Sequence, residues 1–456
     1  MNKSADIIYN PEYFNSLFEE NKQLIENRGN SIINNPRHDA LASFNNLGIP
    51  TKKNENYKYT DLSSSFNVGY KYLFDPEKIN FNVDDVFKCD VPELETEVVL
   101  LLNGFYFDRK NPLKKYSNGL VIGSLAKAAE ELPHIVEKHY RKYAFDDKES
   151  LVALNTAFAL DGIFIYVPRN LILDKPIQII NISLSENDLL IQHRNLFIIE
   201  ENANAKIVVC DHSLSHKRFL TNQVAEVYAG NNAHLDFTRL QNEHLATTQI
   251  SHSYVYQERD SNTIFNTVTL HGGVVRNNVI VKLMGEGCSN STSGLYILDQ
   301  GQHIDNYTLI EHLKPNCLSN QLFKGVLNDY STGAFNGKIY VAKDAQKTEA
   351  YQSNNNILLT NDAKMNSKPQ LEIYADDVKC SHGATVGQLD EDAMFYLRSR
   401  GIDEKEARLM LMNGFANDVI EQIKVEPLQE RITELVTKRL RGELSRCNNC
   451  QMHCGQ

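Results

Sequence analysis

The side chains best suited to chemistry gather in residues 376–383, which read Asp-Asp-Val-Lys-Cys-Ser-His-Gly. Apolar and polar residues alternate through this stretch, which predicts β-strand. Cys380 and His382 are two positions apart, so in a strand their side chains lie on one face, about 6–7 Å apart at Cα. Thiolate and imidazole both bind iron. The pair therefore indicates either metal or cluster ligands, or a structural cysteine beside a half-buried histidine.

Two ligands on one face do not complete an iron–sulfur site, because such clusters usually take four protein ligands. The missing ligands would have to come from another chain or from a distant segment. The adjacent carboxylates of Asp376 and Asp377 are consistent with a simple solvated turn.

A second candidate metal site lies at the end of the chain. Cys447, Cys450, His453 and Cys454 could supply four ligands to zinc or to an iron–sulfur cluster. Zinc modules usually contain two separated ligand pairs, whereas these four residues lie within eight positions, without a second structured half. A metal-binding tail and a flexible, oxidisable tail are both open interpretations.

Three helices are expected after the reactive stretch. Asp390 is a favourable N-cap, and Gly401 suits the position after the helix end. Asp403 with Glu406 forms a capping box that begins a second helix. A third helix begins at Pro427, and its apolar stripe is typical of core or of a partner-docking surface. The stripe consists of Leu428, Ile432, Leu435, Val436 and Leu440.

The preceding region, from about residue 165 to 385, contains short alternating strands separated by Asn, Gly, Ser and Asp. Turn-plus-strand units at 201–209, 230–237 and 260–268 begin about 29 residues apart, which indicates a solenoid of stacked coils. A β-sandwich has equally short strands and is the alternative fold.

The N-terminal third is expected to be mixed and largely helical. Residues 10–28 and 124–143 each carry an apolar helical face, and a polar link with aromatic anchors occupies 48–62. The expected domains are an N-terminal domain at 1–160, a β core at 161–388, a C-terminal helical domain at 389–446 and a cysteine-rich tail at 447–456.

Composition narrows the class of protein. The 456 residues suffice for two or three domains, and the net charge of −11 argues against a nucleic-acid-binding surface. No signal-like segment or run of about 18 apolar residues occurs, so we expect a cytoplasmic chain without membrane contact. The sequence has no GxxxxGK[ST] loop for binding a nucleotide and no GxSxG nucleophile motif.

The strings ADDVKCSHGAT (375–385), FYLRSRGI (395–402) and NGFANDVI (413–420) resemble the SufD branch of the SufB/SufD family, whose members belong to the SUF iron–sulfur cluster assembly machinery. The resemblance extends over most of the chain. It implies a mostly β protein, with a right-handed parallel β-helix core flanked by N- and C-terminal helical regions. The family usually has Trp where this chain has Tyr57.

The resemblance implies a non-enzymatic scaffold subunit that pairs with a SufB paralogue, or with a second copy of itself when isolated, and docks the ABC-type ATPase SufC. His382, with Cys380, would lie at the SufB interface, where an iron–sulfur cluster forms transiently. Phe395, Tyr396 and Arg398 approximate the ATPase-docking surface. The family's complex is associated with reduced flavin, but no feature of this sequence indicates a flavin site.

Two positions distinguish the branches of the family. SufB has Glu in the place of Gly383, and a thiol where this chain has Ser353; a hydroxyl cannot replace a thiolate as a ligand or sulfur acceptor. The alternative functions are a SufB-like protein, or a stand-alone metal-binding protein that uses the cysteine tail. A polysaccharide-active β-helix is disfavoured, because no signal peptide or cluster of acids on one coil is evident.

Overall fold

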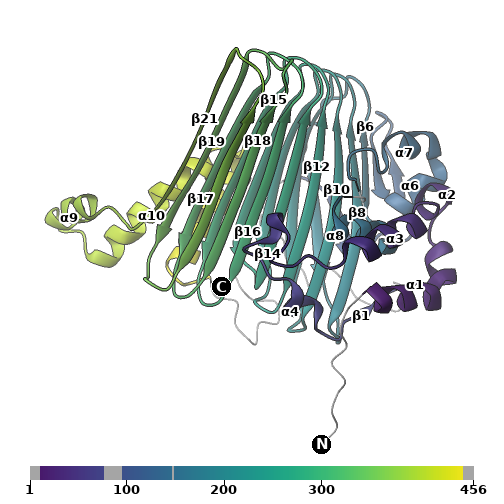
Figure 1. Ribbon diagram of the computed structural model, residues 1–456, viewed down its shortest axis with the longest axis horizontal. Coiled ribbons are helices and arrows are strands. Elements are labelled where there is room, and N and C mark those ends of the chain that lie inside the picture. The colour runs from purple at the N-terminus through teal and green to yellow at the C-terminus, as the bar shows by residue number, and fades with distance from the viewer. Residues whose placement is uncertain (1–10, 76–94, 146–147, 445–456) are drawn as a thin grey trace, which may run out of the picture.

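The computed structural model describes residues 11–75, 95–145 and 148–444, and its centre is a parallel β-solenoid (Figure 1). Successive strands alternate between two facing sheets, so each coil stacks on the previous one; β10, for example, pairs in parallel with β8 and β12. Parallel pairing confirms the expected β-helix and excludes the β-sandwich, whose strands would be antiparallel.

The first sheet contains, in spatial order, β20 (Lys364–Ile373), β18 (Thr332–Val341), β16 (His303–His312), β14 (Val274–Leu283), β12 (Thr248–Gln257), β10 (Phe219–Ala229), β8 (Leu189–Ile199), β6 (Ile163–Val167), β5 (Val121–Ser124) and β4 (Leu113–Lys115), with β1 (Lys71–Tyr72) beside β8. The second contains β21 (Val378–Gly387), β19 (Thr348–Leu358), β17 (Leu318–Leu327), β15 (Ser289–Leu298), β13 (Asn262–His271), β11 (His234–Asn242), β9 (Asn204–Ser213), β7 (Ile177–Ser183), β2 (Glu97–Leu102) and β3 (Phe105–Tyr106).

One corner of each coil is built by a residue in the left-handed backbone region, which Asn, Asp and Gly adopt most readily. Side-chain amides bridge successive corners: Asn202 donates to Asn170 at 2.8 Å, and Asn232 donates to Asn202 at 2.9 Å. This recurring corner explains the loose repeat in the sequence. The corner residues are Asn170, Asn202, Asn232, Asp260, Gly287, Asn316 and Lys347.

N-terminal helices pack on the first sheet and share a core with it. The fully buried α8 contacts α3, β8 and β10. The helix expected over 124–143 is instead two helices, because Pro133 has no N–H and opens a new helix at its first position. The helices are α1 (Pro11–Glu26), α2 (Ser31–Asn34), α3 (Arg37–Leu47), the 3₁₀ helix η1 (Glu55–Tyr57), α4 (Ser63–Phe66), α6 (Leu125–Glu131), α7 (Pro133–His139) and α8 (Ser150–Phe158).

The aromatic anchor Tyr57 joins the 48–62 link to the solenoid. Its ring is buried, its hydroxyl donates to Glu149 Oε1 at 2.8 Å, and the Arg276 guanidinium lies 4.0 Å from the ring centroid. Arg276 also forms a buried ion pair with Asp305, which accepts from the hydroxyl of Thr60. The link is therefore fixed across the strands of the first sheet.

The C-terminal helices are α9 (Glu391–Ser399), α10 (Glu404–Ile420) and α11 (Glu426–Leu440). Asp390 and Asp403 accept backbone N–H groups as N-caps, and Gly401 has a φ of 86° after α9. The apolar stripe of α11 is core, since it packs with α10 on the second sheet. None of the described helices combines the length and hydropathy that crossing a bilayer requires.

Arg439 fastens α11 to the solenoid. Its buried guanidinium donates to Leu270 O at 2.8 Å, Asp299 Oδ2 at 2.6 Å and Gln302 Oε1 at 3.1 Å. Burial alone would raise the pKa of Asp299, but the hydrogen bond and charge of Arg439 hold that pKa below its usual value.

Candidate functional site

Cys380 and His382 lie on β21, the last strand of the solenoid (Figure 1). Their register partners on β19 are Ala350 and Gln352, which are both buried between the sheets, whereas the intervening Tyr351 is exposed. Because in-register neighbours on parallel strands share a face, Cys380 and His382 occupy inward-facing positions of the last coil. The face that the side chains of Cys380 and His382 were predicted to share is therefore the inner face of the last coil, at the open end of the solenoid.

The two side chains differ in environment. Cys380 is half-buried and packs against a small apolar cluster that includes Ile339 and Ala350. Burial raises the pKa of its thiol, so the resting residue is protonated at neutral pH. His382 is exposed, which contradicts the interpretation as a half-buried histidine. An imidazole and a thiol are both side-chain types that bind iron.

Both sheets end in open edges at this coil. No described strand pairs with the outer side of β20 or β21, so their outward backbone N–H and C=O groups lack strand partners. Exposed apolar side chains accompany the edges: Tyr374 is 60% exposed, Val386 45% and Tyr351 38%. Open edges with apolar side chains are suited to a partner that continues the sheets.

The residues around the pair also have clear positions. Asp376 and Asp377 are exposed in the turn before β21, and the backbone N–H of Asp377 donates to Gln346 at 2.9 Å, as a solvated turn predicts. Gly383 and Ser353 are register partners on β21 and β19. A Cβ atom added to Gly383 would meet nothing within 4 Å. Neighbouring atoms therefore leave room for a larger residue in the place of Gly383.

Helix α9 projects from the body of the protein beside the open coil (Figure 1) and has no buried residue. Phe395 is 74% exposed and Tyr396 is 56% exposed. Arg400 lies over the Tyr396 ring at 5.0 Å, and Arg398 pairs with Glu404 at 3.8 Å. An exposed aromatic pair on a projecting helix is typical of an interaction surface.

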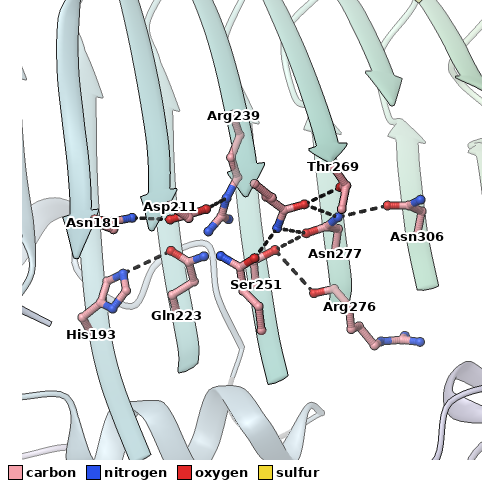
Figure 2. A network of polar contacts seen from close by, with 12 residues as sticks. Asn181, His193, Asp211, Gln223, Arg239, Ser251, Thr269, Arg276, Asn277 and Asn306 are labelled. Carbon is pink, nitrogen blue, oxygen red and sulfur yellow. Dashed lines mark hydrogen bonds and ion pairs between the residues drawn. The ribbon is translucent and has the colours of Figure 1, made fainter. Parts of the chain in front are cut away.

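Sequence reasoning missed the polar interior of the solenoid. Figure 2 shows a network between the two sheets, in which Asp211 accepts from Asn181 at 2.7 Å and from Arg239 at 2.6 Å. Farther along, Asn277 donates to Asn306 at 3.1 Å and accepts from Ser251 at 2.8 Å. The signal was present as Asn, Gln and Thr inside strands, but the same residues also occur on solvent-facing strands.

Among the described residues, no group of three or more His, Cys, Asp or Glu side chains could hold a metal ion. In that part of the chain, Cys380 and His382 therefore have no third side chain of these types grouped with them. The predicted ligands Cys447, Cys450, His453 and Cys454 lie outside the described residues.

Family models and known proteins match this chain along most of its length. Residues 9–179 match the model of the SufBD protein N-terminal region, and residues 182–415 match the SufBD core domain of SUF system FeS cluster assembly. An iron-sulfur cluster assembly SufBD family protein of Synechocystis is 30% identical, covering 91% of this chain and 93% of the relative. Iron-sulfur cluster assembly protein SufD of Escherichia coli is 30% identical over 88% and 92% of the two chains, and SufD of Bacillus subtilis is 26% identical over 71% and 74%.

Proposed function

The chain belongs to the SufBD family of the SUF iron–sulfur cluster assembly system, as a SufD-like member, and on that premise we propose that it acts as a scaffold subunit without a catalytic site of its own. It would pair with a SufB-type paralogue, dock the SufC-type ATPase and contribute side chains to cluster assembly at the paralogue interface.

The observation that carries this proposal is the last coil. Cys380 and His382 occupy inward-facing positions above the buried Ala350 and Gln352, and no described coil covers them. A scaffold needs such an incomplete site, because a cluster held too tightly by one chain could not be passed on. Iron and sulfide are cargo here, and the remaining ligands would come from the partner.

The paralogue would join at the open edges of β20 and β21. A second solenoid placed end to end continues both sheets, satisfies the outward backbone groups and covers Tyr374 and Val386. His382 would then lie within the interface, where surrounding protein excludes water. The imidazole is the ligand, and the half-buried thiol of Cys380 can become a second ligand when a metal ion replaces its proton.

The ATPase would bind α9, where Phe395 and Tyr396 are exposed. A nucleotide-driven change in the ATPase can shift the paralogue interface only if its nucleotide states bind α9 with different affinity. Helices α10 and α11 connect α9 to the second sheet through a shared apolar core. A displacement of α9 would thereby be transmitted to the solenoid, which includes the last coil.

The test replaces His382 by Ala in cells that depend on this chain. We expect lower activity of cluster-dependent enzymes, while the amount of recovered complex stays unchanged, because the substituted side chain is exposed and holds no part of the fold. Ser381→Ala, one residue away at the register position of the exposed Tyr351, is the matched control and should behave as wild type. Normal cluster maturation with His382→Ala would refute the assigned role of this histidine.

A further inference from the structure

Small side chains line one inner corner of the solenoid, immediately after the left-handed corner residues. The register of neighbouring strands stacks these positions coil upon coil. Cysteine occupies two adjacent coils, at 288 and 317, and both side chains are 1% exposed. The stacked positions are Ala203, Ala233, Ser261, Cys288, Cys317 and Thr348.

The two thiols share hydrogen-bond partners. Cys288 Sγ donates to Gly285 O at 3.2 Å, and Cys317 Sγ donates to the same oxygen at 3.3 Å. The backbone N–H of Leu318 donates to Cys288 O at 2.9 Å, so the two cysteines are direct neighbours across the ladder. Strand spacing places their Cα atoms about 4.8 Å apart, within the window of roughly 4.4–6.8 Å that disulfides occupy.

We propose that Cys288 and Cys317 form an oxidisable dithiol, which a hydroperoxide converts to a disulfide linking two adjacent coils. The Cys288 thiolate attacks the peroxide: an S–O bond forms, the O–O bond breaks, and the leaving oxygen takes a proton to give water or an alcohol. Cys317 sulfur then attacks Cys288 Sγ, so that the S–S bond forms and the S–O bond breaks, with release of water. Two thiols lose two electrons, and the peroxide gains them.

The surroundings favour Cys288 as the attacking residue. Its sulfur lies 3.8 Å from the hydroxyl oxygen of Ser261. The interaction between the two side chains lowers the pKa of Cys288, and the same interaction, together with burial, raises the pKa of Cys317. Glu286 and Asn316, in the turns that precede the two cysteines, are exposed.

The experiment treats the folded full-length chain with hydrogen peroxide, blocks remaining thiols under denaturing conditions and maps cysteine-containing peptides by mass spectrometry. We expect a peptide pair joined through Cys288 and Cys317, lost after reduction with dithiothreitol. The buried Cys210 provides an internal control, because no other cysteine of the described residues is stacked on it. The disulfide should also raise the thermal unfolding midpoint, reversibly, because it restricts the unfolded chain.

Single substitutions test the order of steps. Cys317→Ser should leave a sulfenic acid on Cys288 that dimedone traps, whereas Cys288→Ser should leave Cys317 reduced at the same peroxide dose. Circular dichroism establishes that both variants are folded. The proposal is overturned if Cys288 and Cys317 of the native chain remain fully alkylatable at a dose that oxidises Cys380, or if they become linked only after unfolding.

Discussion

Gln352 and His382 are register partners on the neighbouring parallel strands β19 and β21, yet Gln352 is 3% exposed and His382 is exposed to solvent. The two residues hold the same position in successive coils. Their difference arises because β19 is covered by a further strand and β21 is not. Within the described residues, both polar atoms of the Gln352 side chain lack a hydrogen-bond partner. The interior of the solenoid therefore ends at His382.

The open surroundings of Gly383 on the last coil lead to a first prediction. Gly383→Glu should change the free energy of unfolding by less than about 0.5 kcal/mol, because an added side chain meets no neighbour and points to solvent. In Gly162→Ala, by contrast, the new Cβ would collide with the backbone of Arg194, and we expect a loss of about 2 kcal/mol or more. Denaturant titration of both variants measures the difference. Equal stabilities would contradict the assigned environments.

The proposed docking of the ATPase on α9 gives a second prediction. Phe395→Asp should lower capture of the ATPase at least tenfold, because removing a central aromatic anchor and burying a charge in its place costs about 2 kcal/mol or more of binding free energy. Tyr330→Asp removes an aromatic residue that is 66% exposed in the turn after β17 and should leave capture unchanged. Quantitative pull-down with purified ATPase compares them. Equal capture by both variants would place the docking surface elsewhere.

The anchor of α11 gives a third prediction. Arg439→Leu should lower the free energy of unfolding by about 3 kcal/mol, because it removes buried hydrogen bonds and leaves the Asp299 carboxylate without its partner. Arg441→Leu is the matched control. Its exposed guanidinium lies 3.7 Å from Glu406, and its loss should cost less than about 1 kcal/mol. Similar effects in both variants would show that Arg439 does not fasten α11.

Buried histidines give a fourth prediction, for the pH dependence of stability. Burial lowers the pKa values of His193 and His312 to about 4, from 6.5 in a solvated chain. Between these values the unfolded chain binds protons that the folded chain does not, so the free energy of unfolding falls as pH decreases from 6.5 towards 4. Each histidine contributes a slope of up to about 1.4 kcal/mol per pH unit.

Denaturant titrations at pH 7 and pH 5 measure this slope. His312→Asn should reduce it by removing one titrating group that is buried in the folded chain. A stability that stays constant between pH 7 and pH 5 would disprove the contribution of the buried imidazoles.

Features encoded locally could be predicted from the sequence. Asp390, Gly401 and Asp403 define helix ends through their own side chains or backbone freedom, and the repeat follows from one left-handed corner residue per coil. The exposure of His382 and its relation to Gln352 depend on which strand is last in the stack, which no local pattern encodes. The polar interior was missed because alternation in a strand shows two faces without telling which one is covered.

The central claim is that this chain is a scaffold between two partners, and recovery of those partners tests it most directly. The tagged chain is captured from its native lysate without oxygen, and co-purifying proteins are identified by mass spectrometry. The account predicts an ABC-type ATPase together with a paralogous β-solenoid subunit, and selective loss of the ATPase from Phe395→Asp. Recovery of the wild-type chain with neither protein would contradict the account.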